Sequence, residues 1–229
     1  MKQFFKSFSE HIFYSNIIIA LAAACLYMYY AMISGSQFPF ILPLLIFCST
    51  YIVYHAQRIG DHLLHVKDES RFNKYYKSNK ASTSILTIFS IGVCLYSLFV
   101  LDINKIIILL FCVCLSFLYI KIPFTKISLR SIPYSKPFVI ALVWTFVTSV
   151  LNDKTNILHH FDAYVFILLL CIPFDIKDTD IDEKEKTITL ATKFKANLTI
   201  PLLILASLYC AFIHTFWPGS FSIIFAILY

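Results

Sequence analysis

The sequence predicts an all-α fold: a polytopic transmembrane bundle of about seven helices, followed by a short apolar stub. Three observations predict it. The 229 residues are 59% hydrophobic and only 14% charged, far from the composition of soluble domains. Apolar stretches recur along the chain at lengths close to the ~20 residues that a helix needs to cross a bilayer. All but two of the 19 Lys and Arg residues fall in alternate connections between these stretches.

Seven apolar stretches are the candidate spans: Ile12 to Ser34, Phe38 to Ala56, Thr83 to Leu101, Ile103 to Ile120, Phe138 to Leu151, Phe161 to Phe174 and Leu198 to Trp217. The fifth and sixth have only 14 residues each. We expect them to cross a membrane only if polar flanks continue each helix into protein-lined or wet space. The final stretch, Gly219 to Tyr229, would measure about 16 Å as a helix, too short to cross.

The basic residues predict the orientation. Lys105 and Lys154 are the two exceptions to the alternate pattern, so the other connections belong on the cytoplasmic face together with the N-terminus. The connections after the second and sixth spans then share that face. We therefore expect a multi-pass protein of the inner (cytoplasmic) membrane with one domain over residues 1–229. The net charge of +6 is explained by this membrane bias, and we expect no nucleic-acid partner.

Three aspartates follow the sixth span at helical spacing. Asp175, Asp178 and Asp182 fall within about 60° of one another on a helix. Such a face repels itself unless a cation binds to it, and carboxylate oxygens suit Mg²⁺, which completes its shell with water and substrate phosphates. The four glycines lie too far apart to form a glycine-rich phosphate loop. The aspartates therefore predict a magnesium site for a phosphorylated ligand.

A second polar face follows the second span. If that helix continues past Ala56, one face displays Gln57, Asp61, His65 and Asp68, with Tyr54 beside them. The basic residues Arg58, Lys67 and Arg71 lie in the same segment and would attract an anionic ligand. Both polar faces end on the cytoplasmic side in the predicted topology, so we expect them to contribute to one site.

These two segments resemble the motifs of the UbiA family of intramembrane prenyltransferases, NxxxDxxxD after the second helix and DxxDxxxD after the sixth. The stretch from Asp175 to Asp182, followed by Thr189-Leu190, is similar to the second motif at full spacing. The stretch Ile132-Pro-Tyr-Ser-Lys136-Pro137, leading to Trp144, is similar to the entry of the family's fifth helix. Three positions depart from the family pattern: Gln57 replaces Asn, His65 replaces the last Asp of the first motif, and Lys186 replaces a glycine.

The resemblance implies transfer of an isoprenyl group from an isoprenyl diphosphate to a lipophilic acceptor, such as an aromatic compound, in the presence of membrane lipids and Mg²⁺. It implies catalytic roles for Asp61, Asp178 and Asp182. Metal ligands would be Asp61, Asp68, Asp175, Asp178 and Asp182, and substrate-binding residues Tyr54, Gln57, Arg58, Lys67 and Arg71. Lys121, Lys126, Arg130 and Lys136 are explained by the positive-inside bias, and Asp162 by a cap at the membrane interface.

Several alternatives remain open at this point. The chain has fewer predicted spans than the nine-helix family bundle, so a second copy in a homo-oligomer would complete the substrate tunnel, or the chain is a catalytically inactive UbiA-like scaffold. A membrane transporter is a less favoured alternative, because transporters place their ionisable groups near mid-membrane, whereas these lie at helix ends. A charged run beside a span is also commonly a solvated connection.

Overall fold

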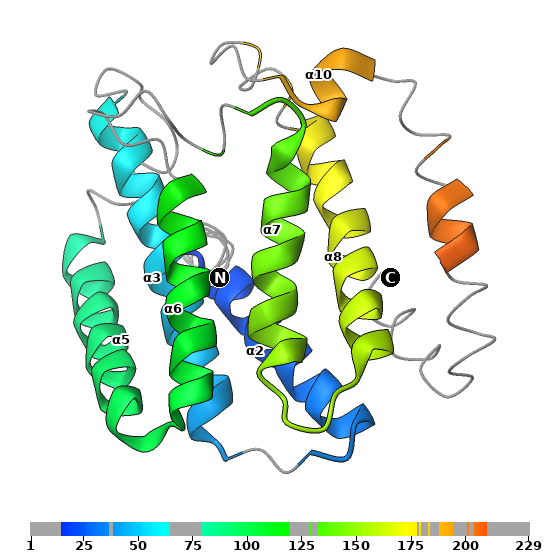
Figure 1. Cartoon of the computed structure of the whole chain (residues 1–229). Helices are drawn as coiled ribbons and strands as arrows, with labels where there is room; N and C mark the ends of the chain where they lie inside the picture. Colours follow the sequence, from blue (N-terminus) through cyan, green and yellow to red (C-terminus); the bar gives the residue numbers. More distant parts are fainter. Residues whose placement is uncertain are drawn as a thin grey trace, which may run out of the picture. The chain divides into compact units, whose positions relative to one another are not determined.

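The fold is all-helical wherever the computed structural model describes the chain (Figure 1). It describes residues 15–36, 39–64, 79–119, 132–177, 188–194 and 204–209, together with 129, 179, 183 and 201, and no strand occurs among them. The chain forms two compact units, each described by itself. Unit 1 contains residues 1–128 and 143–160, and unit 2 contains residues 129–142 and 161–229. The single domain expected over the whole chain stays a prediction.

Unit 1 is built from helices α2 (Ile17–Ile33), α3 (Ile41–Leu64), α5 (Lys80–Val100) and α6 (Ile103–Tyr119), and the π-helix η2 (Phe146–Val150). Helix α2 packs against α3 and η2, α5 packs against α3, and α6 packs against η2. Buried side chains from α2, α3 and the residue after η2 form the core: Ala23, Tyr27, Leu42, Ile46 and Leu151. This core holds α2 against α3, the helix on which the first polar motif begins.

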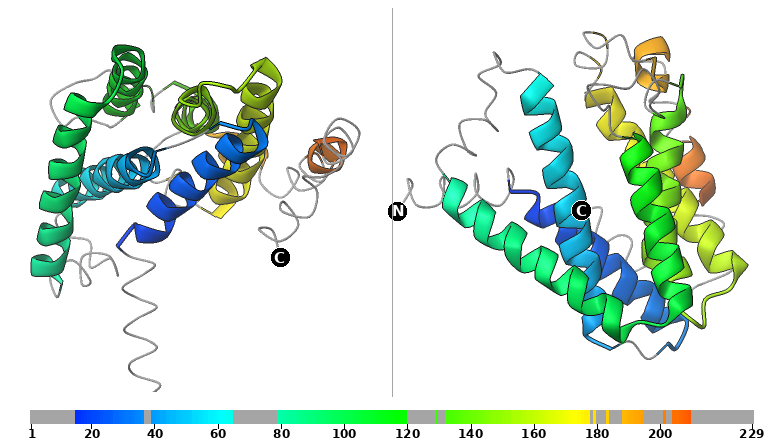
Figure 2. Two further views of the ribbon diagram at one scale, coloured as in Figure 1. Left: turned by 90° about the horizontal axis from the view of Figure 1, so that it is seen from below. Right: turned by 60° about the vertical axis from the view of Figure 1, so that its left-hand side comes forward.

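Helix α5 buries three small polar residues and exposes most of its large apolar ones. Its buried residues are Thr83, Ser90 and Ser97, spaced by seven so that they form one stripe. Large apolar side chains such as Ile88 and Phe99 are exposed instead. Figure 2 shows α5 at the edge of unit 1 in both views. Close packing through small residues with apolar residues facing outward is typical of helices whose surroundings are lipid.

Unit 2 contains the beginning of α7 (Ser135–Thr145), most of α8 (Ile157–Lys177), α10 (Leu190–Phe194) and a short helical stretch at residues 204–209. The apolar run of the sixth predicted span is short, and polar flanks continue its helix, as expected for a crossing. Helix α8 has 21 residues, because it starts before the apolar run, in the polar segment that contains His159 and His160, and continues past Phe174 into the aspartate motif. Polar flanks thus lengthen this helix.

Two described helices are long and apolar enough to cross a membrane, α5 and the stretch Ile157–Ile176 of α8. Four shorter apolar helices accompany them, at Ile17–Ile33, Ile41–Gln57, Ile103–Tyr119 and Ser135–Val150. The last of these matches the fifth predicted span and is short, as expected. Much of the seventh predicted span lies outside the described residues. The count of seven spans therefore stays a prediction.

The expectation for Asp162 is wrong. The residue lies in the second turn of α8 and is only 4% exposed, so it is not a cap at an interface. The Tyr209 hydroxyl donates a hydrogen bond of 2.7 Å to its Oδ1 atom. Tyr209 is itself buried and belongs to the helical stretch at 204–209. This bond connects two segments of unit 2 that are far apart in the sequence.

Candidate functional site

Helix α3 extends well past its apolar run and contains the first part of the first motif. The expected continuation is confirmed as far as Leu64, so Gln57 and Asp61 lie on the same helix as Tyr54. Tyr54 and Gln57 are both half-buried. The side chains of Arg58 and Asp61 are not among those described. His65, Lys67, Asp68 and Arg71 lie outside the described residues, so their predicted roles are neither confirmed nor contradicted.

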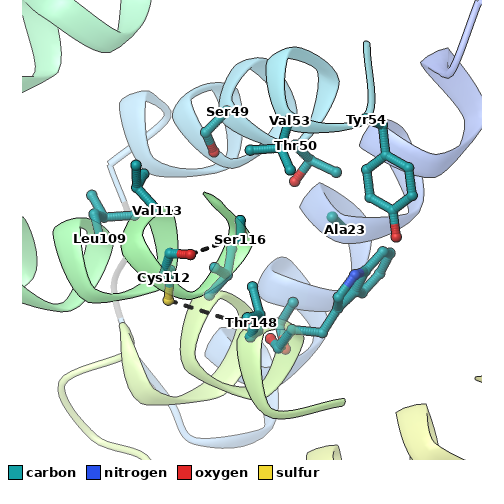
Figure 3. Close-up of a pocket in the computed structure, with 13 residues that line it drawn as sticks. Ala23, Ser49, Thr50, Val53, Tyr54, Leu109, Cys112, Val113, Ser116 and Thr148 are labelled. Atoms are coloured by element: carbon teal, nitrogen blue, oxygen red, sulfur yellow. Dashed lines mark hydrogen bonds between the residues drawn. The ribbon is translucent and has the colours of Figure 1, made fainter. Parts of the chain in front are cut away.

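An apolar cavity of about 60 Å³ lies within unit 1, next to this part of α3. Its walls come from α2, α3, α6 and the segment from α7 into η2: Ala23, Ser49, Thr50, Val53, Tyr54, Leu109, Cys112, Val113, Ser116, Val143, Trp144, Val147 and Thr148. Figure 3 shows Thr50 and Tyr54 on one wall and Cys112 and Ser116 on another. The cavity is small beside ligand pockets of roughly 300–1,000 Å³, so it holds a small apolar group rather than a whole isoprenyl chain.

Three of the five hydroxyl groups in the cavity wall, those of Ser49, Ser116 and Thr148, bond to their own helices. The Oγ atom of Ser116 donates to the Cys112 carbonyl oxygen at 2.8 Å, and the Oγ1 atom of Thr148 donates to the Trp144 carbonyl oxygen at 2.7 Å. Ser49 bonds in the same way to the Ile46 carbonyl oxygen. Because these donors already have acceptors within the protein, an apolar ligand would not leave them unpaired. The cavity is therefore suited to hydrocarbon.

A π-helix forms part of the same wall. In η2 the Leu151 amide donates to the Phe146 carbonyl oxygen, five residues earlier, at 3.2 Å. The wider turn begins two residues after Trp144 and includes Val147 and Thr148, which line the cavity. Such π-turns are rare and often occur at functional sites. Nothing in the apolar pattern of this segment predicts the wider turn.

The second motif begins with a buried ion pair in unit 2. Asp175 lies in the last turn of α8 and is only 3% exposed. The Nζ atom of Lys136, in the first turn of α7, lies 3.0 Å from its Oδ1 atom. Asp178 and Asp182 lie outside the described residues. Lys136 is thus a partner of Asp175. From the sequence, this lysine was explained only by the positive-inside bias.

The Thr-Leu pair after the second motif starts a helix. Thr189 is fully buried and precedes α10. Its Oγ1 atom accepts a hydrogen bond from the Thr192 amide at 3.2 Å, and the Oγ1 atom of Thr192 accepts one from the Thr189 amide at 2.9 Å. This reciprocal arrangement is a capping box with threonine in place of the usual Glu or Gln. Thr189 therefore caps the start of α10.

Within the described residues, no three His, Cys, Asp or Glu side chains come together as a group that could hold a metal ion. The described candidate ligands are Asp175, which pairs with Lys136, and Gln57, which offers a neutral amide oxygen. The remaining predicted ligands are the carboxylates of Asp61, Asp68, Asp178 and Asp182, whose side chains are not described. The chemistry of this donor set fits Mg²⁺, which prefers oxygen ligands; the coordination geometry stays a prediction.

The two motifs belong to different units, Asp61 to unit 1 and Asp175 to unit 2. Their predicted meeting at one site therefore stays a prediction. Two features of the site escaped the sequence analysis. The only sequence signal for the Lys136–Asp175 pair was that Lys136 lies in the segment that resembles the entry of the UbiA family's fifth helix. The cavity had no sequence signal. Comparisons of the chain with protein-family models, curated proteins and solved structures find no match.

Proposed function

We propose that this chain is a magnesium-dependent intramembrane prenyltransferase, similar to the UbiA family, that transfers an isoprenyl group from an isoprenyl diphosphate to a lipophilic acceptor. One observation supports this most directly. The cavity wall on α3 ends at Tyr54, and Gln57 and Asp61 follow on the same helix about one and two turns later. An apolar binding region next to a polar motif suits a donor with an apolar tail and a charged head.

A membrane location is part of the proposal. Helix α5 and the Ile157–Ile176 stretch of α8 have the length and hydropathy of spans, and the exposed face of α5 is apolar from Ile85 onward. In water, exposed Ile88 and Phe99 would be unfavourable, because apolar surface is driven out of water. In lipid the same face is compatible with its surroundings. The proposed topology has seven spans, a cytoplasmic N-terminus and both aspartate motifs on the cytoplasmic side.

In the proposed site, Asp61, Asp178 and Asp182 would hold Mg²⁺, and Asp68 and the amide oxygen of Gln57 would be further ligands. The bound metal would neutralise the diphosphate and stabilise the charge that develops on it as it leaves. Arg58, Lys67 and Arg71 supply positive charge around the same phosphate oxygens. These residues hold the head of the donor in place while its tail extends toward apolar surroundings.

The reaction breaks the bond between the first isoprenyl carbon and the diphosphate oxygen, and both electrons leave with the diphosphate. The acceptor then supplies the electron pair for the new bond and loses a proton. Tyr54 lies at the cavity wall, where its ring face could stabilise the positive charge on the allylic carbon. The apolar walls protect that carbon from water.

Incubation of the purified protein with labelled farnesyl and geranylgeranyl diphosphates, with and without Mg²⁺, tests the proposal. A membrane extract supplies acceptors. We expect Mg²⁺-dependent pyrophosphate release and a labelled apolar product. Absence of both across a panel of donors would contradict the proposal and favour the inactive scaffold. Donor uptake into liposomes without pyrophosphate release would instead favour a transporter.

A further inference from the structure

The Lys136–Asp175 ion pair buries both of its charges. The side chains of Lys136 and Asp175 are 11% and 4% exposed, and the Nζ and Oδ1 atoms are 3.0 Å apart. The pair between Lys105 and Asp153 in unit 1 differs sharply. Its separation is similar, 2.9 Å, but the Asp153 side chain is 73% exposed. Removing two charges from water is unfavourable, and replacing such a pair by apolar residues is often neutral or stabilising. Stability alone therefore explains the Lys136–Asp175 pair poorly.

The turn that positions Lys136 is held from several sides. Tyr134 has a φ angle of 65°, in the left-handed region that is unfavourable for a bulky residue. Its amide donates to the Ile188 carbonyl oxygen at 3.0 Å. The Nζ atom of Lys193 lies 5.4 Å from the centre of its ring. Ser135 closes the turn through hydrogen bonds to the Ile132 carbonyl oxygen.

This turn therefore contacts Ile188 and Lys193, which follow the second motif. Lys136 contacts Asp175, the first residue of that motif. Strained backbone persists only where the surrounding structure holds it, and it occurs preferentially at functional sites. An ammonium group is a strong partner for phosphate oxygens, and its attraction to them is greater where water is excluded. Both conditions hold at Lys136, beside the motif proposed to bind diphosphate.

We propose that Lys136 contacts the diphosphate of the donor and that Asp175 is a positioning residue, which holds the Lys136 ammonium at the end of α8 rather than binding the metal. This inference rests on the proposed function, because it takes the second motif as the diphosphate site. It assigns metal binding in this motif to Asp178 and Asp182. The competing explanation is that the pair only joins α7 to α8.

Pyrophosphate binding to the full-length protein in detergent separates these explanations, since it needs no turnover. We measure the dissociation constant of Mg²⁺-pyrophosphate by calorimetry, and the Tm, for the wild type and for Lys136→Met, Asp175→Asn and the double variant Lys136→Met/Asp175→Leu. Loss of a hydrogen bond between charged groups should raise the dissociation constant of Lys136→Met by about 10- to 100-fold. Asp175→Asn should raise it less, and adding Asp175→Leu to Lys136→Met should raise it no further.

The double variant is the decisive one. Because it removes both charges, it should fold with a Tm near that of the wild type, yet its weakened binding should remain. If the double variant bound pyrophosphate as tightly as the wild type, the pair would be only a structural link and the inference would be overturned. Lys105→Met is the matched control. It removes a lysine of similar exposure, 14%, from an ion pair in the other unit, and should leave binding unchanged.

The experiment also distinguishes this inference from the proposed function. A wild-type protein that binds no pyrophosphate, with or without Mg²⁺, would overturn both. A wild-type protein that binds pyrophosphate equally well after Lys136→Met would overturn the inference alone. In turnover assays, the inference further predicts that Lys136→Arg, which keeps the positive charge, restores part of the lost donor affinity.

Discussion

Asp178 and Asp182 are the residues on which the proposed chemistry depends most. Both are metal ligands in the proposal, and a carboxylate gives Mg²⁺ a negative charge that a neutral amide of the same shape lacks. We predict that Asp178→Asn or Asp182→Asn lowers the rate of Mg²⁺-dependent pyrophosphate release by at least about 100-fold, since each removes a charge that stabilises the transition state. The Tm in detergent should change little.

Asp102→Asn is the control for these substitutions. Asp102 has an 80% exposed side chain and pairs with Lys105 at 3.5 Å, in the connection between α5 and α6. It has no place in the proposed site, so its substitution should leave the rate unchanged. Wild-type rates in both Asp178→Asn and Asp182→Asn would remove these residues from the mechanism.

Tyr209 and Asp162 test the packing of unit 2. Tyr209→Phe removes the hydroxyl that donates at 2.7 Å to the buried Asp162 carboxyl. Hydrogen bonds to charged groups contribute about 1.5–3 kcal/mol, so we predict a decrease of that size in the free energy of unfolding, measured by denaturant titration in detergent. Tyr96→Phe is the control, because Tyr96 is 60% exposed. Equal losses in the two variants would contradict the role of this bond.

The residue scale also shows how far a sequence identifies a site. Spacing alone singled out Asp175 as a charged group on a helix, and the structure confirms that α8 reaches it. It did not identify Lys136 as its partner, because that contact depends on how the turn around Tyr134 folds back. Asp162 lies near the end of an apolar run, which suggested an exposed cap. The residue is buried instead, because Tyr209, distant in the sequence, donates a hydrogen bond to its carboxyl group.

At the scale of the element, helix α5 gives the clearest test of helix packing. Ser90 is fully buried on the stripe that also contains Thr83 and Ser97. A leucine at this position would push α5 away from α3, where the Tyr51 hydroxyl bonds to the Thr83 carbonyl oxygen. We predict that Ser90→Leu lowers the free energy of unfolding by about 1–3 kcal/mol, measured by thermal unfolding in detergent.

Ile88→Leu is the matched control for the α5 test. Ile88 is 70% exposed, so a change of branching there should leave the free energy of unfolding almost unaltered. If Ser90→Leu were as harmless as Ile88→Leu, the buried stripe would not be a close helix contact. If Ile88→Leu were the more damaging, the exposed face of α5 would be an interface rather than a lipid-facing surface.

The helices themselves were predicted well where apolar runs are long. Helices α2, α3, α5 and α6 lie close to the first four predicted stretches, because hydropathy reports directly on segments that avoid water. The sixth apolar stretch is shorter than the helix that contains it, as expected, since the high hydropathy stops at polar residues while α8 continues through them. The π-turn of η2 was not predicted, because it depends on packing rather than on composition.

At the scale of the whole molecule, the predicted topology is directly testable. In the proposed topology, the connection around Asp153 lies outside and the segment around Lys184 lies in the cytoplasm. We predict that, with the native cysteines replaced, a membrane-impermeant maleimide labels Asp153→Cys in intact cells and labels Lys184→Cys only after permeabilisation. Labelling of both positions in intact cells would contradict the single span predicted between Asp153 and Lys184, and labelling of neither would contradict the odd number of spans between a cytoplasmic N-terminus and Asp153.

The site as a whole was only partly predictable. The sequence predicted which polar residues follow which helices, and α3 confirms this for Gln57 and Asp61. Charge repulsion and spacing explain why such residues attract a cation, but not how two helix ends approach each other. The distance between the two helix ends depends on the packing of the whole bundle, which cannot be predicted from a local sequence pattern. The shared site of Asp61 and Asp178 therefore stays a prediction.

The central claim is that the two acidic motifs lie close together on one face of the membrane. Spin labels at His62 and at the exposed Glu183 would report their separation by pulsed electron resonance in lipid nanodiscs, with the native cysteines replaced. The account predicts a narrow distribution well below the ~30 Å thickness of the hydrocarbon core, with further narrowing when Mg²⁺-pyrophosphate binds. A separation of ~30 Å or more, unchanged by Mg²⁺-pyrophosphate, would contradict it.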